Sequence, residues 1–364
     1  MAYRSLPDRN RHGACIGTLE AHCSATNCSV TQRGGHHQEG GASKATLVNK
    51  VSDEVMDDEQ QTDVTRFAAL ERFTDERGLP EQFGQVFLQW YAGITAALAK
   101  RVGTSKSPLL VGLSGCQGSG KSTLVDAMAR VLADAHGVVT TVLSLDDFYL
   151  TKAERESLAQ RVHRLFATRG VPGTHDLDLL RRTVKALQNG DDVALPVFDK
   201  AADDRTKLVH YSQGGAPTEI VLLEGWCVGI PPQPKEALDK PINPTEVDLD
   251  PDRIWRTSVN RFLGEGYAAL FAELDALLVL QAPSFNTVFD WRWQQEAQLS
   301  ARFREAHPAE PDPTMTRAQV ADFILYYQRL TEHGMQSLPA RADCLWELAP
   351  DRSVERMHLT GMAA

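Results

Sequence analysis

The residues best suited to chemistry stand together in the stretch GCQGSGKST. It satisfies the pattern G-x-x-x-x-G-K-S with Gly115, Gly120, Lys121 and Ser122. Glycines let backbone N–H groups converge on phosphate oxygens, the lysine reaches the β- and γ-phosphates, and the serine hydroxyl is a ligand for Mg²⁺. The pattern predicts a nucleoside triphosphate site. Its expected contacts are Gly115, Cys116, Gln117, Gly118, Ser119, Gly120, Lys121, Ser122 and Thr123, with the Cys116 thiol a mere filler.

Two acids, Asp146 and Asp147, follow a second β-branched run. Ligands of an open α/β sheet bind at the carboxyl ends of its strands, where an acid can face the γ-phosphate and an incoming hydroxyl. Successive residues of an extended chain point to opposite sides, so we expect one of the pair, Asp146, to face the site. The alternative is that both acids merely cap or solvate the next turn.

Glu224 ends the apolar run IVLLE, a position suited to a Mg²⁺ ligand acting together with Ser122. The alternative is an acid at the surface. Arg292, between Trp291 and Trp293, either belongs to a lid that excludes water from the phosphates or has a structural role.

The stretch FDKAADDR brings Asp199, Lys200 and Arg205 to the end of another predicted strand. Two cations there could clamp a carboxylate or the transferred phosphoryl group, although a solvated charged turn has the same composition. Asp176, in GTHD, directly precedes a predicted helix and is therefore also a candidate N-cap.

Strands and helices must alternate to position these residues. Short apolar or β-branched runs predict strands at 108–114, 138–147, 192–198, 219–225, 275–282 and 342–350. Helices are expected at 122–136, 151–170, 176–190, 251–274, 287–307 and 316–334, the second opened by a capping box of Thr151 and Glu154. The alternation predicts an α/β fold of the P-loop NTPase kind, a doubly wound parallel sheet with helices on both faces.

The chain divides into three segments by composition. Residues 1–60 lack hydrophobic periodicity, so we expect a disordered polar tail; its Cys15, Cys23 and Cys28 lie near histidines, but the spacing matches no common zinc pattern. Residues 61–105 predict an N-terminal extension of two helices, the second with an apolar stripe from Phe83 to Leu98. The kinase-like domain is expected at 106–364.

Composition limits the partners. The chain has 364 residues, a formal net charge of -10 and 42% hydrophobic residues. An acidic balance argues against a broad basic face for nucleic acid or an anionic membrane. No apolar run approaches the ~20 residues that span a bilayer, and the N-terminus has no apolar signal core, so a cytoplasmic protein is expected.

Six stretches together carry a family resemblance: GLSGCQGSGKST, LSLDDFYLT, RGVPGTHD, PVFDKAADDR, LLEGWCVG and FDWRWQQEAQL. Over roughly residues 65–350 the chain resembles the D-glycerate 3-kinase family of P-loop kinases, relatives of phosphoribulokinase and uridine kinase. The resemblance implies ATP and Mg²⁺, Asp146 as the base toward the acceptor hydroxyl, and His175 and Asp176 as acceptor contacts.

The implied acceptor is a small hydroxylated metabolite, with D-glycerate going to 3-phosphoglycerate as the first choice. The loop after Lys200 is shorter than in the plant enzymes, which leaves a nucleoside, a pantothenate-like compound or a sugar phosphate open. A nucleotide-binding regulatory ATPase is the alternative from another class.

Overall fold

The computed structural model describes residues 58–200, 202–211 and 217–361. Residues 1–57 of the predicted tail lie outside it, whereas residues 58–60, also predicted as tail, begin the first helix. The residues from Asp58 onward belong to one compact unit. Among the described helices, none combines the length and the apolar character needed to span a bilayer.

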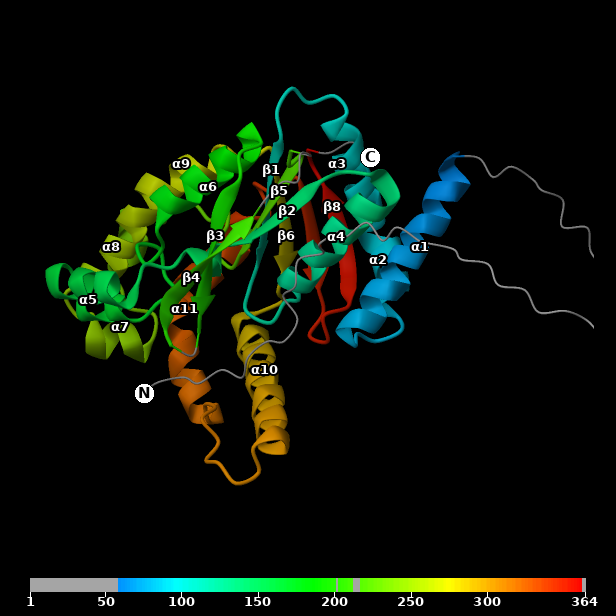
Figure 1. The fold of residues 1–364 in the computed structure, drawn as a ribbon. Coiled ribbons are helices and arrows are strands. Elements are labelled where there is room, and N and C mark those ends of the chain that lie inside the picture. The colour runs from blue at the N-terminus through cyan, green and yellow to red at the C-terminus, as the bar shows by residue number, and fades with distance from the viewer. Residues whose placement is uncertain (1–57, 201, 212–216, 362–364) are drawn as a thin grey trace, which may run out of the picture. The chain divides into compact units, whose positions relative to one another are not determined.

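A six-stranded sheet forms the centre of this unit, in the order β2-β5-β1-β6-β7-β8 (Figure 1). Its strands are β1 (Leu109–Gly115), β2 (Thr140–Ser144), β5 (Ile220–Gly225), β6 (Ala276–Gln281), β7 (Cys344–Leu348) and β8 (Val354–Leu359). The first five run parallel and β8 is antiparallel to β7. Because β1 and β5 are buried along their whole length, helices must cover both faces there. The mostly parallel α/β architecture is confirmed.

One predicted strand lies outside this sheet. β3 (Val193–Asp199) pairs antiparallel with β4 (Asp204–Tyr211), which the sequence did not reveal, in a separate two-stranded sheet. A parallel neighbour needs a long crossover, whereas only a short turn separates β3 from β4. Asp203 in that turn takes φ 53°, a left-handed conformation that aspartate tolerates. We call β3, β4 and their turn the β3–β4 hairpin.

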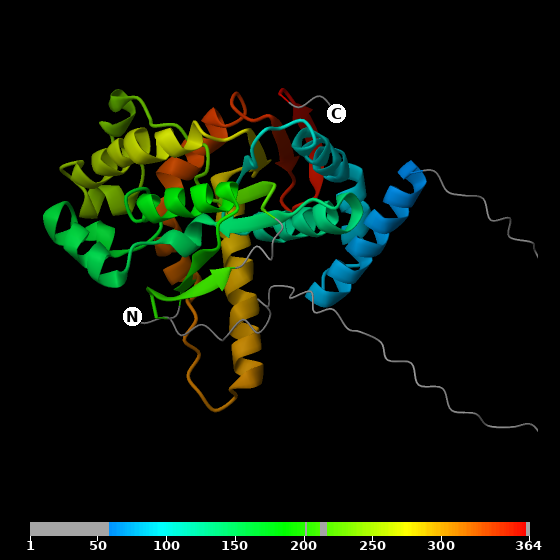
Figure 2. The same ribbon diagram turned by 45° about the horizontal axis from the view of Figure 1, so that its top comes forward.

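Most helices lie where the sequence predicts them, but the helix at 244–249 was not predicted and the one expected at 251–274 is interrupted at 263–267. They are α1 (Asp58–Arg77), α2 (Phe83–Trp90), α3 (Ala92–Val102), α4 (Lys121–His136), α5 (Lys152–Arg161), α6 (Leu177–Asn189), α7 (Pro244–Leu249), α8 (Ile254–Phe262), α9 (Ala268–Phe271), α10 (Phe285–Ala306) and α11 (Arg317–Ser337). A π turn, Leu263–Tyr267, joins α8 to α9. In both ribbon views α10 and α11 lie side by side and extend beyond the sheet (Figures 1 and 2).

One predicted helix ends earlier than expected. The capping box of Thr151 and Glu154 is confirmed, but α5 ends at Arg161 instead of reaching Gly170. The chain turns at His163, whose Nδ1 accepts a hydrogen bond from Leu165 N and starts a separate short 3₁₀ turn, Arg164–Ala167.

The N-terminal extension has three helices instead of two, because α2 and α3 are separated at Tyr91. The Tyr91 ring is buried edge-on against Trp346, with ring centroids 5.0 Å apart, and Trp346 Nε1 donates to the carbonyl of Trp90. α1 lies against α4, to which Arg77 and Arg72 form ion pairs. The extension therefore packs on the helix that follows the phosphate-binding pattern.

Candidate active site

The G-x-x-x-x-G-K-S stretch connects the end of β1 to the start of α4 at Lys121. Gly118 and Gly120 take φ 78° and 88°, conformations that side chains rarely adopt. A Cβ on Gly118 would also lie 2.7 Å from Trp291 Cβ, so α10 closes directly against this loop. The loop therefore has the strand–loop–helix setting that a phosphate-binding loop requires.

Lys121, Ser122 and Glu224 meet at this loop because β1 and β5 are parallel neighbours whose carboxyl ends coincide. Ser122 Oγ lies 3.1 Å from Glu224 Oε1, and Lys121 Nζ lies 3.8 Å from Glu224 Oε2. Glu224 is buried, yet no described group donates a hydrogen bond to its Oε2. A buried carboxylate with spare acceptor capacity beside a hydroxyl fits the oxygen ligands of Mg²⁺.

Asp146 and Asp147 lie in a 3₁₀ turn, Leu145–Phe148, so the expectation of extended chain there was wrong. Their side chains still diverge. Asp146 Oδ1 accepts a hydrogen bond from Tyr149 Oη at 2.9 Å, whereas Asp147 Oδ1 accepts one from Phe198 N, in β3. Asp147 thus ties the β3–β4 hairpin to the main sheet, whereas Asp146 lies near enough to Lys121 of the phosphate-binding loop for the charge of that lysine to lower its pKa.

The β3–β4 hairpin brings a cation to Asp146. Lys200 Nζ lies 3.3 Å from Asp146 Oδ2, and the Lys200 side chain is more than half exposed. Burial alone would favour the neutral acid, but the charges of Lys200 and Lys121 and the hydrogen bond from Tyr149 hold the pKa of Asp146 below its ordinary value. Asp146 is therefore a carboxylate at neutral pH.

His175 is also brought to this place. Its ring stacks on Tyr149, with centroids 4.4 Å apart, and the two residues form an isolated antiparallel bridge. The ring is 5% exposed, and no described residue pairs with its Nε2. A buried polar atom without a partner at the edge of a site is available to a ligand.

Asp176 and Arg205 are engaged with each other. Asp176 Oδ1 caps α6 by accepting from Leu179 N, as the N-cap alternative predicts, while Oδ2 pairs with Arg205 Nη1 at 3.0 Å. Asp199 Oδ1 accepts from Ala202 N inside the hairpin turn. Of the predicted clamp residues Asp199, Lys200 and Arg205, it is Lys200 that contacts Asp146.

Arg292 is held by its own helix. Its guanidinium lies 2.6 Å from the buried Glu296 and stacks over Phe323 of α11. This geometry supports the structural alternative for Arg292 over the lid. Cys116 also fits its expected role as filler, because burial raises the pKa of its thiol to about 11 and keeps it neutral.

Sequence reasoning missed several residues that shape the site. Arg155 is fully buried and donates to three backbone carbonyls, those of Leu150, Ala167 and Asp203. Arg169 pairs with Asp203 and stacks over Phe198. Both arginines fix the hairpin that carries Lys200. Arg169 begins the stretch RGVPGTHD, so the family resemblance could have pointed to it. No motif in the sequence marks Arg155 as a residue of the site.

Comparison with known proteins places these residues in a family. The model of the phosphoribulokinase/uridine kinase family matches residues 110–238, which include Lys121, Asp146, His175, Lys200 and Glu224. The uncharacterized kinase mug58 of Schizosaccharomyces pombe is 34% identical over 230 residues, which cover 60% of this chain and 78% of that protein. The chloroplastic D-glycerate 3-kinase of Arabidopsis thaliana is 28% identical over 235 residues, 62% of this chain and 47% of that protein.

The fold agrees with the sequence matches. A solved structure of D-glycerate 3-kinase from Cryptococcus neoformans superposes with a TM-score of 0.60 at 24% identity, covering 76% of this chain and 99% of that one. The chain belongs to the phosphoribulokinase/uridine kinase family of P-loop kinases.

Proposed function

We propose that this protein transfers the γ-phosphoryl group of ATP to a hydroxyl of a small hydroxy acid, with D-glycerate and 3-phosphoglycerate as the first substrate and product to test. Membership of a kinase family implies ATP binding and phosphotransferase activity. The choice of acceptor draws on the two D-glycerate 3-kinases above. The observation that carries the proposal is the carboxylate of Asp146 between Tyr149 and Lys200, opposite Lys121.

Each residue has a distinct part in the transfer. Backbone N–H groups of the P-loop and Lys121 bind the phosphates and offset the charge that develops on them. Ser122 and Glu224 would hold Mg²⁺, which supplies further charge neutralisation. Asp146 orients the acceptor hydroxyl and takes its proton as the new O–P bond forms and the bond from the γ-phosphorus to the β–γ bridging oxygen breaks, releasing ADP.

Lys200 would bind the negatively charged acceptor as well as lower the pKa of the base, Asp146. A hydroxy acid brings a negative charge into a protein whose formal net charge is -10, so a local cation is needed. Lys200 is the exposed cation beside Asp146, whereas Arg205 is largely buried and paired with Asp176. We assign the contact with the acceptor carboxylate to Lys200, and to Arg205 the role of orienting Asp176.

An acceptor panel tests the proposal. Purified protein with Mg·ATP is given D-glycerate, L-glycerate, uridine, pantothenate or a sugar phosphate, and ADP release is measured. We expect D-glycerate to stimulate ADP release strongly, and phosphorus NMR to find the phosphate on its 3-hydroxyl. Lys121→Ala is the control for background ATPase. Stimulation by uridine instead would make it a nucleoside kinase, and slow hydrolysis with every compound would favour a regulatory ATPase.

A further inference from the structure

His175 is buried beside the proposed base, and its two ring nitrogens differ. Nδ1 lies 2.6 Å from Tyr267 Oη, whereas Nε2 has no partner among the described residues. A neutral imidazole carries its proton on only one nitrogen, and the hydrogen bond made by the other nitrogen decides which. The contacts of Tyr267 therefore determine what His175 can offer to a ligand.

Tyr267 Oη is constrained by a second hydrogen bond. The backbone N–H of Gly173 donates to it at 3.1 Å. Burial raises the pKa of Tyr267 well above its ordinary value, so the phenol keeps its proton. The hydroxyl proton needs an acceptor, and Nδ1 of His175, 2.6 Å away, is the acceptor described for it, whereas Gly173 N–H can only donate. The proton of the neutral imidazole then resides on Nε2.

The ring is neutral near pH 7. Burial lowers the pKa of His175 to about 4, although the negative charge of Asp146 acts in the opposite direction. The oxygens of Asp146 already accept from Tyr149 and Lys200, and Asp176 pairs with Arg205. His175 Nε2 has no hydrogen-bond partner among the described residues, so neither carboxylate takes up the Nε2–H group.

Two irregular backbone segments serve this contact. Tyr267 ends the π turn between α8 and α9, a rare widening of a helix that often occurs at functional sites. Gly173 takes φ 102°, and a Cβ there would lie 2.4 Å from Phe262 Cδ2. A regular helix at 263–267 would move Tyr267 Oη away from Gly173 N and His175 Nδ1. A residue larger than glycine at position 173 would displace Gly173 N from Tyr267 Oη.

We propose that Tyr267 is a positioning residue that holds His175 as the neutral Nε2–H tautomer, so that the imidazole donates a hydrogen bond to an oxygen of the phosphate acceptor. For a hydroxy acid that oxygen belongs to the carboxylate, and in this respect the inference rests on the proposed function. A neutral donor binds the oxygen without pairing with Asp146. A protonated imidazole would instead form an ion pair with that carboxylate and weaken it as a base.

The tautomer is measured directly in the full chain without substrate. Long-range ¹H–¹⁵N correlation spectra identify the protonated ring nitrogen of His175. We expect Nε2–H alone in the wild type and a mixture of both tautomers in Tyr267→Phe, which keeps the buried ring but removes the hydroxyl. Tyr91→Phe, a buried tyrosine in the N-terminal extension, is the matched control and should leave the His175 signals unchanged.

Kinetics provide the second measurement. Tyr267→Phe should raise the KM for the acceptor roughly 10-fold, about the effect of one hydrogen bond, while the KM for ATP and acceptor-free hydrolysis stay normal. His175→Gln, whose amide nitrogen can take the place of Nε2–H, should retain more activity than His175→Asn.

The inference is overturned if the wild type carries the proton on Nδ1, or if Tyr267→Phe changes neither the tautomer nor the acceptor KM. A wild-type protein that phosphorylates no hydroxy acid overturns the proposed function instead, and the NMR result still decides the tautomer.

Discussion

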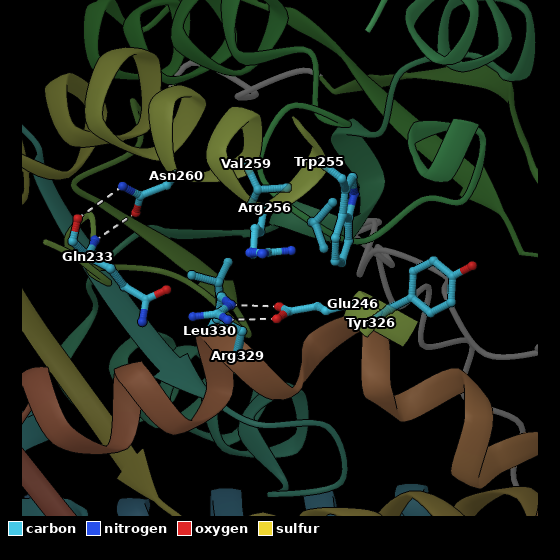
Figure 3. Close-up of a pocket in the computed structure, with 10 residues that line it drawn as sticks. Gln233, Glu246, Trp255, Arg256, Val259, Asn260, Tyr326, Arg329 and Leu330 are labelled. Carbon is cyan, nitrogen blue, oxygen red and sulfur yellow. Dashed lines mark hydrogen bonds and ion pairs between the residues drawn. The ribbon is translucent and has the colours of Figure 1, made fainter. Parts of the chain in front are cut away.

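Two groups of charged side chains in the described part of the molecule differ in how completely they are paired. The first group, which we call the α8–α11 clamp, consists of Glu246, Asp250, Arg256 and Arg329. Figure 3 shows Glu246, Arg256 and Arg329. Arg329 of α11 binds both oxygens of Glu246 at 2.6 Å and also donates to the carbonyls of Ala237 and Lys240.

The rest of the clamp is equally well paired. Arg256 of α8 binds Asp250 at 2.9 Å and the carbonyl of Leu238 at 2.8 Å. The polar atoms without a partner there, Trp255 Nε1 and Gln233 Oε1, belong to uncharged groups. They border a cavity of about 10 Å³, room for roughly one water molecule. The four charged groups of the clamp are therefore all paired with one another, and none of them is left to bind a ligand.

The candidate active site is the second group, and its ion pairs are longer and incomplete. Lys121 and Glu224 are 3.8 Å apart, Lys200 and Asp146 are 3.3 Å apart, and Glu224 Oε2 accepts no hydrogen bond from the described residues. Buried charges that are fully bonded hold helices together, whereas partly bonded ones retain capacity for substrate and metal. The two regions should therefore respond differently to the loss of one charge.

Lys121→Ala should have the largest effect on turnover. The lysine charge acts directly on the β- and γ-phosphates, so kcat/KM should fall by about 10³-fold or more and ATP binding should weaken. The free energy of unfolding should fall by less than in Arg329→Met below, because Lys121 makes one long contact with Glu224 whereas Arg329 binds both oxygens of Glu246. Steady-state kinetics and denaturant unfolding measure the two quantities. Full turnover in the variant would remove the kinase interpretation.

Arg329→Met should affect stability instead. It leaves Glu246 buried without its partner, which costs about 3–5 kcal/mol of unfolding free energy. The protein that remains folded at low temperature should keep its activity. Arg261→Met, which breaks the exposed α8 pair with Glu265, is the control and should cost less than about 0.5 kcal/mol. A stable Arg329 variant with lost turnover would contradict the distinction between the two regions.

Local sequence rules predicted much of the fold and part of the site. The P-loop, the capping box of Thr151 and Glu154, and the ends of α6 at Asp176 and Gly190 depend on residues a few positions apart. Such signals are visible in a single sequence. The parallel sheet followed from the alternation of strands and helices.

Long-range pairing could not be predicted in the same way. Nothing in the sequence around β3 indicates that it lies outside the main sheet. The fully buried Arg155 fixes the hairpin through carbonyls up to 48 positions away. Tyr267 is 92 positions from His175, and its hydroxyl direction depends on a π turn without a simple sequence signature. These contacts arise only when the elements have packed.

The pair Asp146 and Asp147 provides the finest test, because the two acids are neighbours with different partners. Asp146→Asn keeps the size of the side chain but removes the charge that accepts the hydroxyl proton, so kcat should fall by about 10²-fold. Affinity for Mg·ATP should stay near normal, since the P-loop, Lys121 and Ser122 are intact. Asp147→Asn should cost much less, because its amide oxygen can still accept from Phe198 N.

The pH dependence of these variants sharpens the assignment. Lys200 and Lys121 hold the pKa of Asp146 below its ordinary value of 3.8, so the carboxylate form persists throughout the neutral and mildly acidic range. The wild-type kcat should therefore lose nothing to protonation of Asp146 between pH 5 and pH 8, a range well above the ordinary aspartate pKa of about 3.9. In Lys200→Met the pKa of Asp146 should rise, and any acid limb of the kcat profile should move to higher pH.

Two outcomes would contradict the assignment of Asp146 as the base. An Asp146→Asn variant that loses Mg·ATP affinity in step with kcat would identify Asp146 as a metal-holding acid. An inactive Asp147→Asn with an active Asp146→Asn would assign the base to Asp147.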